Sequence, residues 1–412
     1  MRVVLSTYGS RGDVEPMVAL AIRLRDLGVE VRLCAPPDFE ERVAEVGVPM
    51  IPVGPSVRRM LAGGTQSTEE LLDRAAELIA AQFDAVAAAA EGCDALVAAG
   101  QFPAAAGAHS VAEKLGIRYV YASFQQLTLP SPHRPPPYPG WRFPPETGNR
   151  ELWDLDARNI DALFGPALNT QRAAAGLPPL HDIRDHTFTD RPWLATDPVL
   201  DPWQEPADLD VAQTGAWILP DARPLPAELA AFLDAGAPPV YVGFGSMPMA
   251  ASDITQATVE AIRAQGRRVV VSHGWAEPAP TGAREDCLTI GDVNHQALFD
   301  RVAAVVHHGG AGTTTAAARA GTPQVVIPQL ADQPYWARRV AELRIGAAFG
   351  PGSAPAPESL SAAFEIALAP ETRTRAATVA ESLRMGGTAV AAAMLVVKDE
   401  APTDGGTWPI LW

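Results

Sequence analysis

Residues 305–333, VVHHGGAGTTTAAARAGTPQVVIPQLADQ, restrict the possible folds of this chain more than any other segment. An apolar run at Val302–Val306 predicts a buried strand, a glycine-rich turn follows it, and three threonines open an alanine-rich helix. The first N–H groups of such a helix have no partner within the helix and lie at the positive end of its dipole. We therefore expect an anion site, suited to a phosphate, at the end of a strand in a parallel α/β sheet.

A second apolar run, Gln324–Pro328, leads to Asp332 and Gln333. Because consecutive parallel strands end at the same edge of a sheet, this polar pair should lie beside the phosphate site. A carboxylate next to a carboxamide can accept from and donate to adjacent hydroxyls of a polyol. The alternative is a helix cap, since Pro334 is well placed to begin a helix expected at Tyr335–Leu343, and both roles can coexist.

Strand and helix patterns alternate along both halves of the 412-residue chain, which is long for a single core. The expected strands are Arg2–Ser6, Glu30–Ala35, Met50–Val53, Ala95–Ala98 and Tyr119–Ala122, then Val240–Gly243, Arg268–Ser272 and Leu288–Ile290. This alternation predicts an α/β protein of two Rossmann-like domains in tandem, with the active site in the cleft between them. The expected divisions are a first domain at 1–216, a linker at 217–226, a second domain at 227–398 and a tail at 399–412.

Composition narrows the classes of partner. The net charge of −16 argues against binding to nucleic acid or to an anionic membrane. No segment approaches the roughly 20 apolar residues of a membrane span, and no signal peptide is evident. The three scattered cysteines, Cys34, Cys93 and Cys287, lack metal-ligand spacing. We expect a cytoplasmic monomer with reduced thiols and no bound metal.

Two segments interrupt the alternation in the first half. Residues 55–68 are expected to be a mobile loop, and the proline-rich segment 128–150 a rigid extended one. Tyr138, Trp141 and Phe143 of the second loop could stack on an aromatic ligand if the loop walls an apolar site.

The first turn between strand and helix contains Ser10, Arg11, Gly12 and Asp13. Asp13 alone would be read as a residue of a helix N-terminus, where a carboxylate is common. Facing a phosphate site across a cleft, it becomes the leading general base for an attacking hydroxyl, with Glu15 as its weaker rival. Ser10, Arg11 and Gly12 could also donate to a diphosphate, although ordinary turn chemistry explains them equally well.

Further donors are expected in the second domain. Ser246, in the turn GFGSM, occupies the place that corresponds to Ser10. His307 and His308 should point in different directions at the end of their strand, and we expect His307 to contact the phosphate. A zinc site is unlikely to form from adjacent histidines without a spaced third ligand. The backbone that would hold the phosphate is that of Gly309, Gly310, Ala311, Gly312 and Thr313.

The segments STYGSRGDVEP, GFGSM, HHGGAGTT and PQLADQ together resemble the GT-B glycosyltransferases of family 1. Within that family the chain is most similar to the vancomycin-group glycopeptide antibiotic glycosyltransferases of actinomycetes. The resemblance extends to about residue 398 and also fits an engineered or chimeric member. Residues 399–412, and the loop at 55–68, carry none of the family's signatures.

The resemblance implies an inverting, metal-independent transfer of a sugar from a UDP- or TDP-sugar to a hydroxyl of a glycopeptide aglycone, without a further cofactor. The donor would bind the second domain and the acceptor the first. Asp13 matches the family's general base, and His307 with the Gly309–Thr313 backbone matches its diphosphate site. Asp332 and Gln333 match the pair that binds the sugar hydroxyls. Val293 matches the segment whose backbone meets the nucleotide base.

Three alternatives remain open at this point. Transfer to a macrolide or other polyketide aglycone would keep the chemistry and change only the acceptor, with loop 128–150 as the place of the difference. A non-catalytic sugar-nucleotide-binding partner would bind donor without transfer, although the intact Asp13 and Asp332 weigh against it. An oxidoreductase is disfavoured because YGSRGD stands where a GxGxxG motif would follow the first strand.

Overall fold

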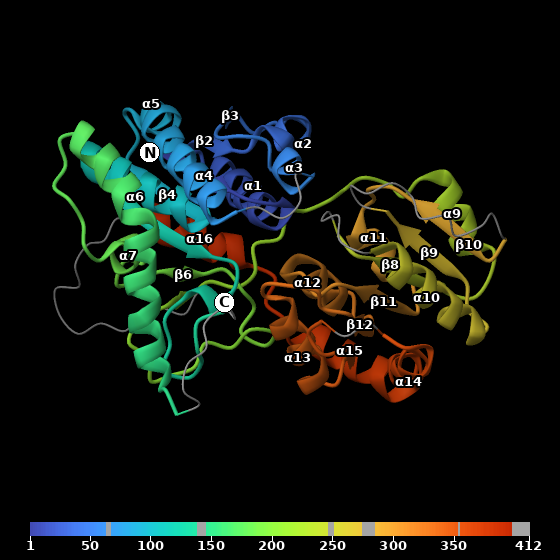
Figure 1. Ribbon diagram of the computed structural model, residues 1–412. Coiled ribbons are helices and arrows are strands. Elements are labelled where there is room, and N and C mark those ends of the chain that lie inside the picture. Colours follow the sequence, from blue (N-terminus) through green and yellow to red (C-terminus); the bar gives the residue numbers. More distant parts are fainter. Residues whose placement is uncertain (63–66, 138–145, 246–250, 274–284, 353–354, 398–412) are drawn as a thin grey trace, which may run out of the picture.

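Two parallel sheets organise the computed structural model of the chain, each in its own α/β domain (Figure 1). The structure describes residues 1–412 except 63–66, 138–145, 246–250, 274–284, 353–354 and 398–412. Helices flank each sheet, and the helix-strand alternation expected from the sequence is confirmed in both halves.

The first domain has a seven-stranded sheet in the order β3-β2-β1-β4-β5-β6-β7, with every pair parallel. Its strands are β1 (Arg2–Tyr8), β2 (Glu30–Ala35), β3 (Met50–Pro52), β4 (Ala95–Gly100), β5 (Arg118–Ser123), β6 (Trp193–Leu194) and β7 (Ala212–Gln213). Its helices are α1 (Arg11–Asp26), α2 (Glu40–Glu45), α3 (Val57–Ala62), α4 (Thr68–Ala81), α5 (Ala87–Ala90), α6 (Phe102–Leu115), α7 (Asn149–Ala174) and α8 (Ile183–Phe188). Two 3₁₀ turns, η1 (Pro37–Phe39) and η3 (Gln126–Thr128), and the π-helical turn η2 (Gln82–Val86) complete it.

The second domain has a six-stranded parallel sheet in the order β10-β9-β8-β11-β12-β13. Its strands are β8 (Val240–Gly243), β9 (Val269–Ser272), β10 (Cys287–Ile290), β11 (Ala304–His307), β12 (Gln324–Val326) and β13 (Gly346–Ala348). Its helices are α9 (Ala227–Asp234), α10 (Ala251–Ala264), α11 (His295–Phe299), α12 (Ala311–Arg319), α13 (Gln333–Glu342), α14 (Pro357–Ala367) and α15 (Pro370–Ser382).

In each sheet the order in which successive strands are added changes sides at one place, between β1 and β4 in the first sheet and between β8 and β11 in the second. Open α/β sheets bind ligands outside the carboxyl ends of the strands at such a point. The β1–α1 turn and the β11–α12 turn therefore lie where the two sheets are best able to bind ligands.

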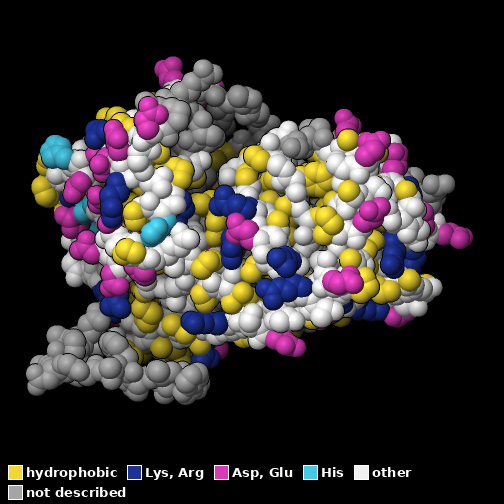
Figure 2. Space-filling model, turned by 90° about the horizontal axis from the view of Figure 1, so that it is seen from below, with side chains coloured by type: hydrophobic (Ala, Val, Ile, Leu, Met, Phe, Trp, Pro, Cys, Tyr) yellow, Lys and Arg dark blue, Asp and Glu magenta, His cyan; other side chains and the backbone are white. Residues whose placement is uncertain are grey.

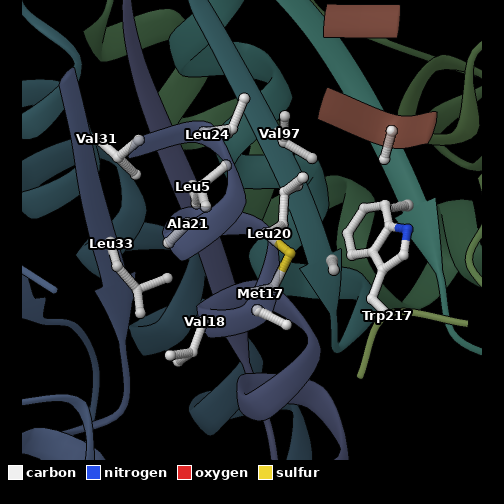
Figure 3. Packing of buried hydrophobic residues seen from close by; sticks show 14 of the residues in the cluster. Leu5, Met17, Val18, Leu20, Ala21, Leu24, Val31, Leu33, Val97 and Trp217 are labelled. Atoms are coloured by element: carbon white, nitrogen blue, oxygen red, sulfur yellow. The ribbon is translucent and has the colours of Figure 1, made fainter. Parts of the chain in front are cut away.

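The core of the first domain forms because α1 has an apolar face that packs on the sheet. Met17, Leu20 and Leu24 of α1 are fully buried with Leu5 of β1, as Figure 3 shows. Trp217, from the segment after β7, is only 3% exposed and belongs to the same cluster. The start of the interdomain segment is thus anchored in the first core.

The last described helix, α16 (Gly387–Val396), returns to the first domain and packs against α1 (Figure 1). Its Ala391, Ala392 and Leu395 belong to the first core. This corrects the expected second domain of 227–398, because a helix that is apolar on all sides gives no sequence signal of which domain it covers.

The stretch 370–396 is the one part of the described chain that is long and apolar enough to be considered as a membrane span. It consists of two helices, α15 on the second domain and α16 on the first, joined at Leu383–Gly386.

Two other expectations needed correction. The segment 55–68 was expected to be a loop, but it contains α3, whose first turn is held by the Asp38 carboxylate through Ser56 Oγ and the N–H of Val57. The 26-residue helix α7 begins inside the segment 128–150, because Asn149 and the residues after it continue into one long helix. Tyr138, Trp141 and Phe143 lie outside the described residues.

Charge is well mixed on the surface viewed in Figure 2. Positive side chains there lie singly or in small groups among acidic and apolar ones, and do not form one continuous basic surface. This distribution agrees with the net charge of −16 and gives a polyanion no extended binding surface on that face.

Candidate active site

Asp13 lies in the first turn of α1, directly beyond the carboxyl end of β1. Its Oδ2 accepts hydrogen bonds from the backbone N–H of Ser10 at 2.7 Å and from Ser10 Oγ at 3.2 Å. Its Oδ1 has no hydrogen-bond partner among the described residues. The helix-terminus role and a role as base are therefore compatible, because they use different oxygen atoms.

The environment of Asp13 makes its carboxyl group a weaker acid than usual. Burial raises the pKa of Asp13 from 3.8 to about 6, the two Ser10 hydrogen bonds lower it in part, and the charge of Asp332 raises it again. A base with a pKa of about 6 is ionised at neutral pH and still basic enough to take a proton from a hydroxyl in a transition state. The Asp13 carboxylate fits here only because residue 9 is a glycine, since a Cβ on Gly9 would lie 2.2 Å from Asp13 Oδ2.

The three residues before Asp13 have distinct surroundings. Ser10 donates both its N–H and its hydroxyl to Asp13. Arg11 pairs with Glu15 at 2.9 Å and reaches across to Asp292 of the second domain, so its guanidinium links the domains. Glu15, the weaker candidate for base, is paired in this way, and Gly12 is exposed at the second position of α1.

His307 is fully buried at the end of β11, and both of its ring nitrogens are occupied. Nδ1 accepts from the N–H of Gly309 at 3.0 Å, and Nε2 therefore donates to Gln324 Oε1 at 2.9 Å. Burial lowers the pKa of His307 to about 3, so the ring is neutral. The expectation that His307 contacts the phosphate is corrected: its ring braces β11 against β12.

His308 has the free ring that the phosphate role requires. It lies between two turns, because a Cβ on Gly245 would be 2.6 Å from His308 Cε1 and a Cβ on Gly310 would be 2.6 Å from Nε2. Its Nδ1 is buried without a partner among the described residues, and burial lowers its pKa to about 4. The residue next to the expected one is thus aimed at the start of α12.

The start of α12 has the geometry of an anion site. Gly310 is the N-cap, and Ala311, Gly312 and Thr313 are the first helical residues, of which Gly312 is exposed. Their N–H groups precede the first intrahelical bond, from Thr314 N to the Gly310 carbonyl at 3.0 Å. Gly309 has φ of 93° and a Cβ there would lie 2.8 Å from Val326, so glycine is required.

Asp332 and Gln333 lie at the start of α13, where Asp332 is partly exposed and Gln333 is buried. Asp332 is the N-cap, and its Oδ2 accepts from Trp336 Nε1 at 2.8 Å. Burial raises the pKa of Asp332, and the charge of Asp201 adds to this effect. Gln333 uses its Oε1 to hold the N–H groups of Gln329 and Leu330 at 2.8 and 3.1 Å, which shapes the turn before the helix.

These groups converge between the two domains. The charge of Asp332 in the second domain contributes to the raised pKa of Asp13 in the first, so the two carboxylates interact across the domains. The arrangement brings together an ionised base, a helix N-terminus with a neutral histidine, and a carboxylate at a second helix start. Such a set can stabilise a leaving diphosphate while activating a hydroxyl.

Two expected site residues remain, Val293, whose expected contact is through its backbone, and Ser246. Val293 is 5% exposed with its side chain in the second core, beside Asn294, which caps α11 and donates to the carbonyls of Asp221 and Arg223. Ser246 lies outside the described residues. Sequence reasoning missed Gln324, whose only signal is a polar residue opening the apolar run QVVIP.

Comparisons with known proteins identify the family of this chain. Residues 3–130 match the model of the glycosyltransferase family 28 N-terminal domain, and residues 268–391 match the erythromycin biosynthesis protein CIII-like C-terminal domain. Glycosyltransferase GtfE of Amycolatopsis orientalis is 55% identical over 408 residues, covering 98% of this chain and 99% of that protein. Vancomycin aglycone glucosyltransferase of the same organism is 55% identical over 407 residues, covering 98% of this chain and 99% of that protein.

Solved structures share the fold at much lower identity. The glycotransferase of kitacinnamycin superposes with a TM-score of 0.70 at 22% identity, covering 96% of this chain and 98% of the other. Spinosyn rhamnosyltransferase SpnG, complexed with thymidine diphosphate, superposes with a TM-score of 0.64 at 19% identity, covering 96% and 100%. The fold agrees with the 55% identity to these relatives over nearly the full length of the chain, and this chain belongs to the vancomycin-group family of GT-B glycosyltransferases.

Proposed function

We propose that the protein transfers a sugar from a UDP- or TDP-sugar to a hydroxyl of a glycopeptide aglycone, with inversion at the anomeric carbon and without a metal ion. The observation that carries this proposal is the Asp13 carboxylate: Ser10 fixes its Oδ2, its Oδ1 has no partner among the described residues, and the charge of Asp332 in the opposite domain helps to raise its pKa. The name of one relative, vancomycin aglycone glucosyltransferase of Amycolatopsis orientalis, supports the choice of acceptor.

The proposed reaction is a single displacement. The acceptor oxygen attacks the anomeric carbon as Asp13 takes its proton, and the bond from that carbon to the diphosphate oxygen breaks. The nucleotide diphosphate leaves with the bonding electrons. One displacement inverts the configuration.

The leaving group would be stabilised by the N–H groups at the start of α12 and by a neutral His308. Fixed donors of this kind stabilise developing charge without reorganising during the reaction. Asp332 and the Nε2 amide of Gln333, whose side chain is buried, would orient the sugar hydroxyls. The reaction would then need no divalent cation.

The test is to incubate the protein with a glycopeptide aglycone and a panel of UDP- and TDP-sugars, with EDTA present, and to measure the mass of the acceptor. A gain of one sugar, with inverted anomeric configuration by NMR, supports the proposal. Asp13→Asn should abolish transfer and leave donor affinity nearly unchanged.

Other outcomes separate the alternatives. Transfer to a polyketide aglycone alone would replace the acceptor, and donor binding without transfer to any acceptor would indicate a binding partner. Loss of donor binding in Asp13→Asn would contradict the assignment of Asp13 as base. Activity that EDTA abolishes would contradict the metal-free mechanism.

A further inference from the structure

A buried polar cluster joins the two domains beside the site. Tyr335 of α13 donates its hydroxyl to Asp201 Oδ1 at 2.5 Å and accepts from Gln126 Nε2 at 2.6 Å. The backbone N–H of Gln126 donates to Asp201 Oδ2 at 3.1 Å. All three side chains are buried, with exposures of 8% for Tyr335, 0% for Asp201 and 3% for Gln126.

On the first domain this cluster continues into the proline-rich segment. The Oε1 of Gln126 accepts from Arg134 Nη1, and Arg134 Nη2 donates to the carbonyl of Leu129 at 3.2 Å. The carbonyl of Arg134 accepts from Trp153 Nε1 at 2.8 Å, and its guanidinium lies 5.0 Å from the ring centre of Trp203. One carboxamide, that of Gln126, thus contacts both Arg134 within segment 128–150 and the hydroxyl of Tyr335.

On the second domain the cluster continues into the residues of the candidate sugar site. Tyr335 follows Gln333 by two positions on α13, and Trp336 next to it donates to Asp332 at 2.8 Å. The helix is one rigid body over this length. A shift of Tyr335 relative to the first domain would therefore shift Asp332 relative to Asp13.

Helix α13 also contacts the first domain outside this cluster. Arg339 of α13 already donates to the carbonyls of Leu200 and Val199 at 2.8 and 3.1 Å. Leu200 is 1% exposed and packs in the second-domain cluster that contains Trp336 and Val340. Burying a carboxylate is costly even when it is well hydrogen-bonded, and such groups are retained in some proteins because they fix one geometry.

We propose that Tyr335, Asp201 and Gln126 are positioning residues for sugar transfer, which set the place of α13, and so of Asp332 and Gln333, relative to Asp13 and the acceptor loop. This inference rests on the proposed transferase function. It predicts that loosening the cluster leaves donor binding intact but misaligns donor and acceptor. Water, which needs no alignment by the protein, then competes with the acceptor for the anomeric carbon.

The experiment compares Tyr335→Phe with the wild-type enzyme on the donor and aglycone that give a mass gain. Three quantities are measured: kcat for transfer, the rate of donor hydrolysis, and the affinity for uridine and thymidine diphosphate by calorimetry. We expect kcat for transfer to fall about tenfold and the ratio of hydrolysis to transfer to rise about tenfold, with diphosphate affinity changed less than about twofold.

Tyr119→Phe is the matched control. Tyr119 donates its hydroxyl to the carbonyl of Ala105 at 3.3 Å within the first domain, so this variant also removes a hydrogen-bonded tyrosine hydroxyl but leaves the interface unchanged. It should keep the wild-type ratio of hydrolysis to transfer. Equal ratios in the wild type, Tyr335→Phe and Tyr119→Phe would overturn the proposal.

A double-mutant cycle keeps the proposal testable if Tyr335→Phe folds poorly. Asp201→Asn, Tyr335→Phe and the double variant are compared at a temperature where all are folded by circular dichroism. A non-additive effect on kcat supports a shared unit, and additive effects refute it. Absence of transfer in the wild type would instead contradict the proposed function, so the two failures are distinguishable.

Discussion

The pKa of Asp13 leads to a pH profile that an ordinary carboxyl group would not produce. With a pKa of about 6, Asp13 is about 90% ionised at pH 7 and about 10% ionised at pH 5. If only the ionised form accepts the proton, kcat/KM should fall about tenfold between these two values. A carboxyl group at the usual 3.8 would remain about 90% ionised at pH 5, and the rate would hardly change.

The assay is initial-rate transfer from pH 4.5 to 8, with kcat/KM as the measured quantity because it reports the titration of the free enzyme. Circular dichroism at each pH shows that the protein stays folded. A profile that is flat down to pH 5 would refute the raised pKa or the assignment of Asp13 as base.

Two variants should move the midpoint of this profile in opposite directions. Asp332→Asn removes a negative charge that raises the pKa of Asp13, so the midpoint should move to lower pH. Ser10→Ala removes a hydrogen bond that stabilises the ionised form, so the midpoint should move to higher pH. Movement in the same direction, or none, would mean that another group controls the profile.

The same pKa has a consequence for stability that does not depend on the chemistry. Because the pKa is higher in the folded than in the unfolded state, folding is weakened by ionised Asp13 above pH 6, and this cost disappears as pH falls toward 4. The shift corresponds to about 3 kcal/mol. Asp13→Asn should therefore gain stability over the wild type by up to about 3 kcal/mol as pH rises through this window, in urea unfolding. A difference that is the same at pH 4 and pH 7 would contradict the shift.

Three further predictions follow from neighbouring contacts. Gly310→Ala places a Cβ 2.6 Å from His308 Nε2, so affinity for nucleoside diphosphate should fall about tenfold or more in calorimetry; unchanged affinity would argue against this site. The pKa of His307 is lowered to about 3, so below pH 6.5 this residue is protonated in the unfolded state but stays neutral in the folded state. Its contribution to the free energy of unfolding should fall by about 1.4 kcal/mol per pH unit from 6.5 toward 3, and His307→Gln should show a shallower pH dependence by one proton. In a double-mutant cycle, Arg11→Gln and Asp292→Asn should show a coupling of below about 1 kcal/mol in the free energy of unfolding, and high salt should remove it because both side chains are partly exposed. A coupling that persists at high salt would contradict this screening by solvent.

The positions of the candidate site could be predicted because they depend on local pattern and on a general property of parallel sheets. A strand followed by SRGD and a strand followed by HHGG end at the strand-order reversals β1/β4 and β8/β11. Since ligands bind at these reversals, the pattern is sufficient to bring both turns to the site. Helix starts also follow local rules, although α1 begins at Arg11, earlier than its apolar pattern at Val14 indicated.

Choices that depend on contacts distant in the sequence could not be predicted. His307 and His308 are equivalent in the sequence pattern, and what distinguishes them is Gln324 on the neighbouring strand, which bonds His307, whereas His308 Nδ1 has no partner among the described residues. Tyr335 and Asp201 are 134 residues apart, and neither local sequence contains a pattern that predicts their contact.

Asp13 shows why one residue can have a structural role at a helix start and also serve as the proposed general base. The helix start fixes the carboxylate, because Oδ2 is held by the N–H and the hydroxyl of Ser10 at the amino end of α1. That fixation is what a general base needs, since a freely rotating side chain would be aligned with the acceptor only part of the time. The free Oδ1 then has a defined direction, and burial together with Asp332 sets its basicity. A helix cap therefore provides the orientation on which the proposed proton transfer depends.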